Sequence, residues 1–147
     1  MSLEEFKYIL IPVTALVSSQ VIKFIIETIK YKKVNIERLL NGNGGMPSSH
    51  SATSFSIVTA IGMAEGFDSP IFALGLVFAC IVAYDASGVR METGKQAVVI
   101  NELVDVVKDK KKNNLEFKKL KEQLGHKPLE VFFGILLGIA IGLIYTI

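Results

Sequence analysis

Long apolar segments set the strongest constraint on how this chain folds. Four runs reach or approach the roughly 20 apolar residues that a helix needs to cross a bilayer. They extend over about residues 8–29, 51–64, 70–86 and 128–147. The second run is short and rich in serine and threonine, but the third and fourth are too uniformly apolar for core helices of a soluble protein. We therefore predict an all-α integral membrane bundle of about four transmembrane helices, folded as one domain over residues 1–147.

The composition agrees with a membrane protein, and its cysteine content excludes an internal disulfide and a multi-cysteine zinc site. Half of the residues are hydrophobic, and the mean hydropathy is +0.45. Cys80 is the single cysteine, so neither an internal disulfide nor a multi-cysteine zinc site is possible within one chain. The N-terminus carries Glu4, Glu5 and Lys7, which do not resemble the basic start of a signal peptide. No cleavable signal peptide is therefore expected.

Basic residues are concentrated in two of the loops between the apolar runs. Fourteen of the sixteen lysines and arginines lie between the first and second runs or between the third and fourth. The short loop after the second run carries Glu65 and Asp68 and no basic residue. The positive-inside rule therefore predicts that both basic loops are cytoplasmic and that both termini lie outside a multi-pass protein of the cell membrane.

The longer basic loop carries two helical patterns. Apolar residues recur with helical spacing within residues 95–107, and again at Phe117, Leu120 and Leu124. We predict two amphipathic helices on the cytoplasmic surface, with their lysines toward anionic headgroups. A solvated, charged and partly helical linker is the alternative interpretation.

The fourth run contains a regular glycine pattern. Gly134, Gly138 and Gly142 recur every four residues and therefore lie on one face of a helix. Small residues at this spacing allow a second membrane helix to approach closely.

Three polar clusters lie at the predicted cytoplasmic ends of the apolar runs. They occupy residues 44–51, 84–90 and 125–130. The topology comes from the lysine distribution and the clusters from side-chain chemistry, so the two observations are independent. Their agreement predicts that the clusters form one site.

The first cluster has the features of an anion-binding helix start. Two glycines free the backbone to approach a ligand, and a proline suited to the first helical turn and a capping serine follow. A helix that begins there directs N–H groups at an anion, with a histidine beside it. An ordinary capped helix with a surface histidine is the alternative. The residues concerned are Gly44, Gly45, Pro47, Ser48, Ser49 and His50.

The third cluster pairs a histidine with a carboxylate. His126 and Glu130 are four residues apart at the start of the fourth run, where Pro128 opens the helix. This spacing places both side chains on one face. A carboxylate that accepts the Nδ1 proton leaves Nε2 free to act as a nucleophile. An ion pair at a helix start, without chemistry, is the alternative.

The second cluster and the first apolar run carry charged side chains. Asp85 and Arg90 flank Gly88 at the end of the third run, and Lys23 lies inside the first. The arginine fork fits phosphate oxygens, and ionisable groups at membrane depth usually have a function. Asp85 could hold Arg90 or Lys23 in place or bind a metal, and Lys23 could instead extend its amine to the membrane surface.

Four segments give the chain a family resemblance that covers almost its whole length. They are GGMPSSHSA at 44–52, YDASGVR at 84–90, GKQA at 94–97 and GHKPLEV at 125–131. With them the chain resembles the divergent branch of the superfamily of type 2 phosphatidic acid phosphatases and vanadium-dependent haloperoxidases. The resemblance implies a helical, phosphatase-like membrane domain.

The superfamily carries three motifs, and this chain matches each of them in part. The first is lysine, six residues, arginine and proline; Lys23 and Lys30 have this spacing, with Tyr31 in place of proline. Arg38 is an alternative to Lys30. The second motif is Pro-Ser-Gly-His, which Pro47, Ser48 and His50 match, while Ser49 replaces the glycine.

The third motif is Ser-Arg, five residues, histidine, three residues and aspartate. His126 and Glu130 match its end, with glutamate in place of aspartate. The Ser-Arg positions hold Lys119 and Leu120, so the motif arginine is missing and Arg90 is the expected substitute. The superfamily core also has more helices than this chain, which suggests a reduced version or one completed by pairing as a homo-oligomer.

The resemblance implies a mechanism that agrees with the chemistry of the clusters. His126 would attack phosphorus, Glu130 would orient it, and His50 would protonate the leaving group. Lys23, Arg90, Ser48 and backbone N–H groups would bind the phosphoryl oxygens. Lysine and arginine supply the positive charge, so no metal or other cofactor is expected.

The expected function is hydrolysis of a membrane lipid phosphate such as phosphatidylglycerophosphate or phosphatidic acid. The expected partners are that lipid and the bilayer, with no nucleic acid. Three alternatives remain at this stage: a polyprenyl pyrophosphate phosphatase; a metal-dependent lipid enzyme that uses Asp85, Glu130 and the histidines as ligands; and a non-enzymatic module that binds lipid or a partner.

Overall fold

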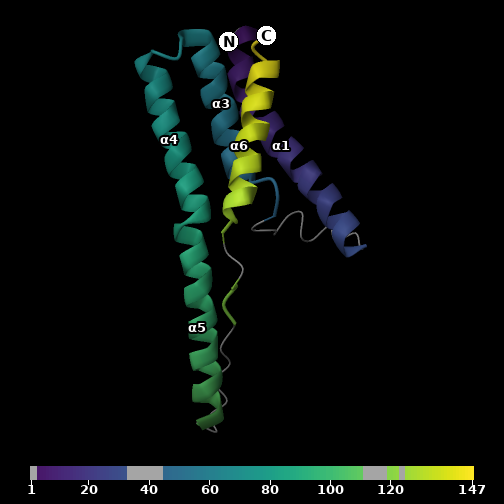
Figure 1. Ribbon diagram of the computed structural model, residues 1–147, viewed down its shortest axis with the longest axis vertical. Helices are drawn as coiled ribbons and strands as arrows, with labels where there is room; N and C mark the ends of the chain where they lie inside the picture. The colour runs from purple at the N-terminus through teal and green to yellow at the C-terminus, as the bar shows by residue number, and fades with distance from the viewer. Residues whose placement is uncertain (1–2, 33–44, 111–118, 123–124) are drawn as a thin grey trace.

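The computed structural model describes residues 3–32, 45–110, 119–122 and 125–147. Within them every regular element is an α-helix, so the predicted all-α fold is confirmed (Figure 1). Four of these helices coincide with the four apolar runs. The elements are α1 (Leu3–Tyr31), α3 (Ser49–Glu65), α4 (Pro70–Ser87), α5 (Val89–Lys110) and α6 (Pro128–Ile144).

α1 and α4 run in one direction through the bundle, and α3 and α6 run in the opposite direction (Figure 1). Both termini and the turn between α3 and α4 lie at one end (Figure 1). The starts of α3 and α6 lie toward the other end, where α4 passes into α5. The three polar clusters lie at the start of α3, at the junction of α4 and α5 and at the start of α6, so the fold places them at the same end of the bundle.

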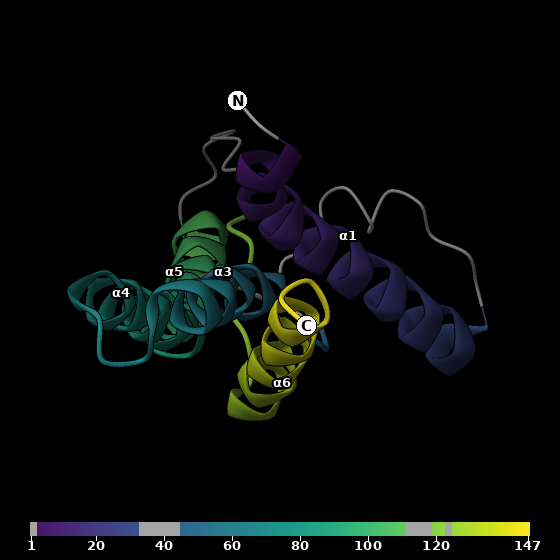
Figure 2. The same cartoon turned by 90° about the horizontal axis from the view of Figure 1, so that it is seen from above.

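The serine-rich helix α3 occupies the centre of the bundle. It packs against α1, α4 and α6 (Figure 2). Ser56 donates to the Thr53 carbonyl at 2.9 Å, and Thr59 donates to the Phe55 carbonyl at 2.7 Å, so these buried hydroxyls are satisfied within the helix. Because α3 is covered by other helices, it can carry hydroxyl side chains that a lipid-facing helix would expose to hydrocarbon.

The glycines of α6 bring this helix into direct contact with α3. A β-carbon at Gly134 would lie 2.5 Å from the Ser48 carbonyl oxygen, and one at Gly138 would lie 2.5 Å from that of Ala52. At Gly142 the corresponding distance, to the Ser56 oxygen, is 2.6 Å. No larger residue fits at these positions without moving the helices apart, so the close approach predicted from the glycine spacing is confirmed.

The outer helices present apolar side chains to their surroundings. The most apolar parts of α1 and of α4 are only 22% and 17% buried inside the protein. Large side chains such as Leu74, Phe78 and Ile81 are each more than half exposed. A core helix of a soluble protein would be mostly buried, whereas lipid-facing helices expose such surfaces.

The first predicted amphipathic helix forms, but its direction differs from the prediction. α5 covers residues 95–107 and continues α4 almost without interruption, with a break only at Gly88 (Figure 1). The Gly88 N–H donates to Tyr84 and its carbonyl accepts from Glu92, so hydrogen bonding carries the helix through the break. α5 therefore projects away from the bundle instead of turning to lie across its end.

The second predicted amphipathic helix is wrong where the structure describes it. Residues 119–122 have no helical structure. The Asn101 carboxamide donates to the Leu120 carbonyl at 2.9 Å and accepts from the Leu120 N–H at 2.9 Å, which ties this segment to α5. These bonds satisfy the backbone without a helix. Phe117 and Leu124 lie outside the described residues.

Candidate active site

Backbone hydrogen bonds join the three polar clusters. The Ser48 N–H donates to the Glu130 carbonyl at 2.8 Å, which ties the start of α3 to the start of α6. The His126 N–H donates to the Ala86 carbonyl at 2.8 Å, which ties the segment before α6 to the end of α4. Segments separated by up to about eighty positions in the chain are thus held together by main-chain contacts, which do not depend on side-chain rotamers.

His126 and Glu130 form the predicted pair. Nδ1 of His126 lies 3.0 Å from Oε2 of Glu130, and the histidine side chain is only 4% exposed. The Lys127 N–H donates to the same carboxylate oxygen at 3.2 Å. An ionised carboxylate only accepts hydrogen bonds, so this contact favours the tautomer with the imidazole proton on Nδ1 and the lone pair on Nε2.

The surroundings of His126 favour a neutral imidazole. Burial lowers the pKa of His126 below its ordinary value of 6.5, and the charge of Lys23 acts in the same direction. The hydrogen bond from His126 to Glu130, the charge of that carboxylate and the backbone of Gly45 oppose this shift without reversing it. A neutral histidine at physiological pH is the form that can act as a nucleophile.

His50 lies beside His126 at the start of α3. The two ring centroids are 5.9 Å apart, and the rings meet edge to face. His50 is exposed whereas His126 is buried, so the pair extends from the interior to the surface of the protein. Arg90, Lys23 and Asp85 are close enough to interact electrostatically with His50.

Lys23 reaches this group from α1. It is buried, with 6% of the residue exposed, and interacts electrostatically with Glu130. Its aliphatic carbons pack against Gly45, where a β-carbon would lie 3.1 Å from Lys23 Cδ. Gly45 has a φ of +90°, so both its conformation and the space available favour glycine. The Lys23 side chain is therefore enclosed by the protein and does not extend over its outer surface.

Arg90 is brought to the site by the fold. A β-carbon at Gly125, whose φ is +90°, would lie 2.9 Å from the Arg90 carbonyl carbon, so the segment before His126 packs directly on the start of α5. Arg90 Nε donates to Asp85 Oδ2 at 2.8 Å. This contact orients the guanidinium and leaves its two terminal nitrogens for a ligand. Of the two partners considered for Asp85, the structure selects Arg90.

The serines of the first cluster are part of the helix start. Ser48 caps α3, and its hydroxyl oxygen accepts from the Ser51 N–H at 3.4 Å. Ser48 and Ser49 are both buried. Pro47 precedes the cap, so its expected position in the first helical turn was wrong. The N–H groups of Ser49 and His50 come too early in α3 to have an acceptor within the helix.

Some predicted residues do not join this group. Lys30 is exposed in the last turn of α1, with its amine 5.3 Å from the centre of the Tyr31 ring. This end of α1 leads away from α3 and α6 (Figures 1 and 2). Arg38 and Gly44 lie outside the described residues. Among the described residues, Lys23 and Arg90 are thus the predicted cations at the site.

One residue of the site was missed from the sequence. Glu27 interacts electrostatically with Lys23, and its Oε1 would lie 3.3 Å from a β-carbon at Gly45. The signal was its position four residues after Lys23 within an apolar run, since that spacing places both on one helix face.

The described residues contain no group of three or more histidine, cysteine, aspartate or glutamate side chains arranged to hold a metal ion.

Comparison with known proteins agrees with the resemblance seen in the motifs. A family model described as the divergent PAP2 family matches residues 5–141, which include every part of the site. The chain belongs to the divergent PAP2 family. The expected superfamily branch is therefore confirmed.

A relative of this PAP2 family member adds the cellular context. The chain is 44% identical over 139 aligned positions to the uncharacterized membrane protein YuiD of Bacillus subtilis strain 168, an alignment that covers 88% of this chain and 87% of the relative. No solved structure matches. Together with the exposed apolar helices, this similarity identifies the chain as an all-α membrane protein.

Proposed function

We propose that this divergent PAP2 family member is a membrane lipid-phosphate phosphatase that acts through a phosphohistidine intermediate. The single observation that carries the proposal is the buried His126–Glu130 pair, with His50 at 5.9 Å between ring centroids. A neutral histidine oriented by a carboxylate, beside a second histidine and two cations, has the groups that phosphoryl transfer requires.

The first half of the reaction transfers the phosphoryl group to the protein. Nε2 of His126 attacks phosphorus, and the bond between phosphorus and the ester oxygen breaks. His50 gives its proton to the departing alkoxide, which leaves as the alcohol. Lys23, Arg90 and the first N–H groups of α3 neutralise the charge on the phosphoryl oxygens.

The second half returns the protein to its starting state. Water attacks the phosphorus of phosphohistidine while neutral His50 accepts one of its protons. The bond between nitrogen and phosphorus breaks, and inorganic phosphate leaves. The net reaction consumes one water and releases one alcohol and one phosphate, with no oxidation or reduction.

The orientation of the site limits which lipids can reach it as substrates. The distribution of basic residues favours a multi-pass arrangement with the site toward the cytoplasm. Inner-leaflet lipids that carry a terminal phosphate, such as phosphatidylglycerophosphate or phosphatidic acid, are then the substrates within reach. A site on the opposite face would instead meet a polyprenyl pyrophosphate carrier.

The test is phosphate release by the purified full-length protein in lipid nanodiscs. The panel contains phosphatidylglycerophosphate, phosphatidic acid and a polyprenyl pyrophosphate, each with and without EDTA. Release that withstands EDTA and disappears in the His126→Ala variant supports the proposal. Release that is lost with EDTA and restored by a divalent ion would support a metal-dependent enzyme. If folded protein releases no phosphate from any of the three lipids, a binding module becomes the better interpretation.

A further inference from the structure

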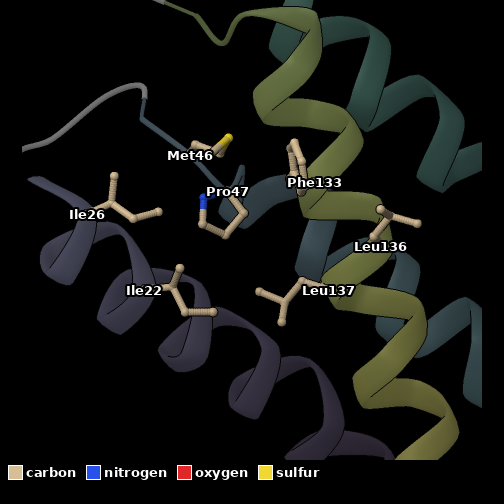
Figure 3. A pocket seen from close by; sticks show the side chains of 7 residues that line it. All are labelled: Ile22, Ile26, Met46, Pro47, Phe133, Leu136 and Leu137. Carbon is tan, nitrogen blue, oxygen red and sulfur yellow. The ribbon is translucent and has the colours of Figure 1, made fainter.

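An apolar groove lies next to the candidate active site. It has a volume of about 330 Å³, at the lower end of the roughly 300–1,000 Å³ of ligand pockets (Figure 3). It is formed by α1 on one side, α6 on the other and the two residues that precede the cap of α3. All seven lining side chains are apolar: Ile22, Ile26, Met46, Pro47, Phe133, Leu136 and Leu137.

The groove and the site are built from adjacent residues on the same three segments. Ile22 directly precedes Lys23, and Met46 directly follows Gly45, which packs against the Lys23 side chain. Phe133 lies three residues after Glu130 on α6, close to one turn further along the helix. A ligand with its charged end at Lys23 and His126 would therefore have its next atoms at this groove.

The groove is open toward the apolar surface of the protein. Phe133 is 42% exposed and Leu136 is 46% exposed, and both also line the groove. In a bilayer these side chains face hydrocarbon, so a lipid tail can enter from the side without crossing water. The polar end beside it carries Lys23, which fits an anionic headgroup.

We propose that this groove between α1 and α6 binds one hydrocarbon chain of the phosphate-bearing lipid whose headgroup occupies the site. This inference rests on the proposed function for the position of the headgroup. The carbons nearest the headgroup lie against Met46, Ile26 and Phe133, and those further along lie against Ile22 and Leu137. The groove makes the protein select phosphates that carry a chain over soluble phosphate esters.

The first experiment detects the chain directly and does not depend on turnover. The full-length protein in nanodiscs is irradiated with a phosphatidic acid that carries a diazirine on one acyl chain, and the labelled residues are mapped by mass spectrometry. A phosphatidylcholine with the same diazirine is the control for bulk lipid. We expect labelling at Ile26, Met46 and Phe133 that excess unlabelled phosphatidic acid reduces at least fivefold. Labelling spread evenly over the outer faces of α1, α4 and α6, or equal with both probes, would overturn the proposal.

A matched pair of variants tests the groove against the rest of α1. Ile26→Trp fills the groove, whereas Ile25→Trp places the same side chain on the neighbouring position, which is 49% exposed and does not line it. We expect Ile26→Trp to reduce labelling by the phosphatidic acid probe about fivefold and Ile25→Trp to leave it unchanged. Equal effects of the two variants would overturn the assignment.

Kinetics separate failure of the groove from failure of the proposed function. With dioleoyl phosphatidic acid, Ile26→Trp should raise KM about tenfold, and with the soluble dihexanoyl form it should change KM less than twofold. If the groove holds no chain, the ratio of the KM of Ile26→Trp to that of the wild type would be the same for both lipids. If the wild-type protein releases no phosphate from either lipid, the proposed function fails, and the labelling still decides whether the groove binds a chain.

Discussion

Nδ1 of His126 lies 3.0 Å from Oε2 of Glu130, and the same carboxylate oxygen accepts the Lys127 N–H at the start of α6. The contact orients the imidazole and favours the tautomer with its proton on Nδ1. Two of the predictions depend on this arrangement: the loss of phosphate release in the His126 and Glu130 variants, and the position of the acid limb of the pH profile.

Replacement of His126 with alanine should abolish phosphate release, by about 10³-fold or more, since it removes the nucleophile. Glu130→Gln should cost less, on the order of 10²-fold, because it disturbs orientation and charge but keeps the attacking nitrogen. Both variants are assayed for phosphate release after size-exclusion chromatography has shown that they are folded. Near-normal turnover by His126→Ala would exclude a phosphohistidine mechanism.

Orthovanadate should inhibit the protein, and EDTA should not. A site that stabilises five-coordinate phosphorus also holds vanadate, which adopts that geometry stably. Inhibition should be competitive with the lipid substrate and should weaken at least tenfold in Arg90→Ala, because Arg90 is proposed to bind the phosphoryl oxygens. Equal sensitivity to vanadate in Arg90→Ala and in the wild type would show that Arg90 does not bind the phosphoryl oxygens.

The acid limb of the pH profile should lie below 6.5. Burial lowers the pKa of His126, so the neutral nucleophile persists to a lower pH than an exposed histidine would allow. Glu130 raises that pKa, and Glu130→Gln should therefore move the acid limb to still lower pH while it reduces kcat. The measurement is kcat/KM against pH for both proteins. Movement of the limb to higher pH in Glu130→Gln would contradict the proposed contact.

The position of the site relative to the membrane can be measured by cysteine labelling in intact cells. Cys80 is exposed and is first replaced with alanine. A cysteine at Asp68, in the turn between α3 and α4, should react at once with a membrane-impermeant maleimide, and one at Glu102 on α5 should react only after lysis. The reverse result would place the site outside and would favour a polyprenyl pyrophosphate as substrate.

Packing of α6 on α3 should tolerate no side chain at Gly138. Gly138→Ala places a methyl group 2.5 Å from the Ala52 carbonyl oxygen and should destabilise the protein by about 1–3 kcal/mol. Gly75→Ala on α4 is the matched control, because its closest contact is a movable methyl group of Val58 at 3.1 Å. Thermal unfolding in detergent compares the two variants. A similar loss of stability in both variants would show that α6 does not pack more closely on α3 at Gly138 than α4 does at Gly75.

Much of the fold was determined by local features of the sequence. The apolar runs gave the positions of α1, α3, α4 and α6 because the length and hydropathy of a membrane helix are properties of one segment. The spacing of His126 and Glu130 and the cap at Ser48 were predictable for the same reason, since each depends on residues within one turn.

Contacts between distant segments were decided only by the tertiary structure. The packing of Gly125 on Arg90 and the burial of Lys23 against Gly45 each depend on how helices lie in space. The second amphipathic pattern failed for a related reason: the backbone of Leu120 hydrogen-bonds to Asn101 nineteen residues away, and this tertiary contact replaces the helix that local periodicity favoured. Sequence alone predicted most of the candidate groups, though it missed Glu27 and included Lys30. The packing of α1, α3, α4, α5 and α6 decided which of them meet, because side chains meet only where the helices that carry them are packed together.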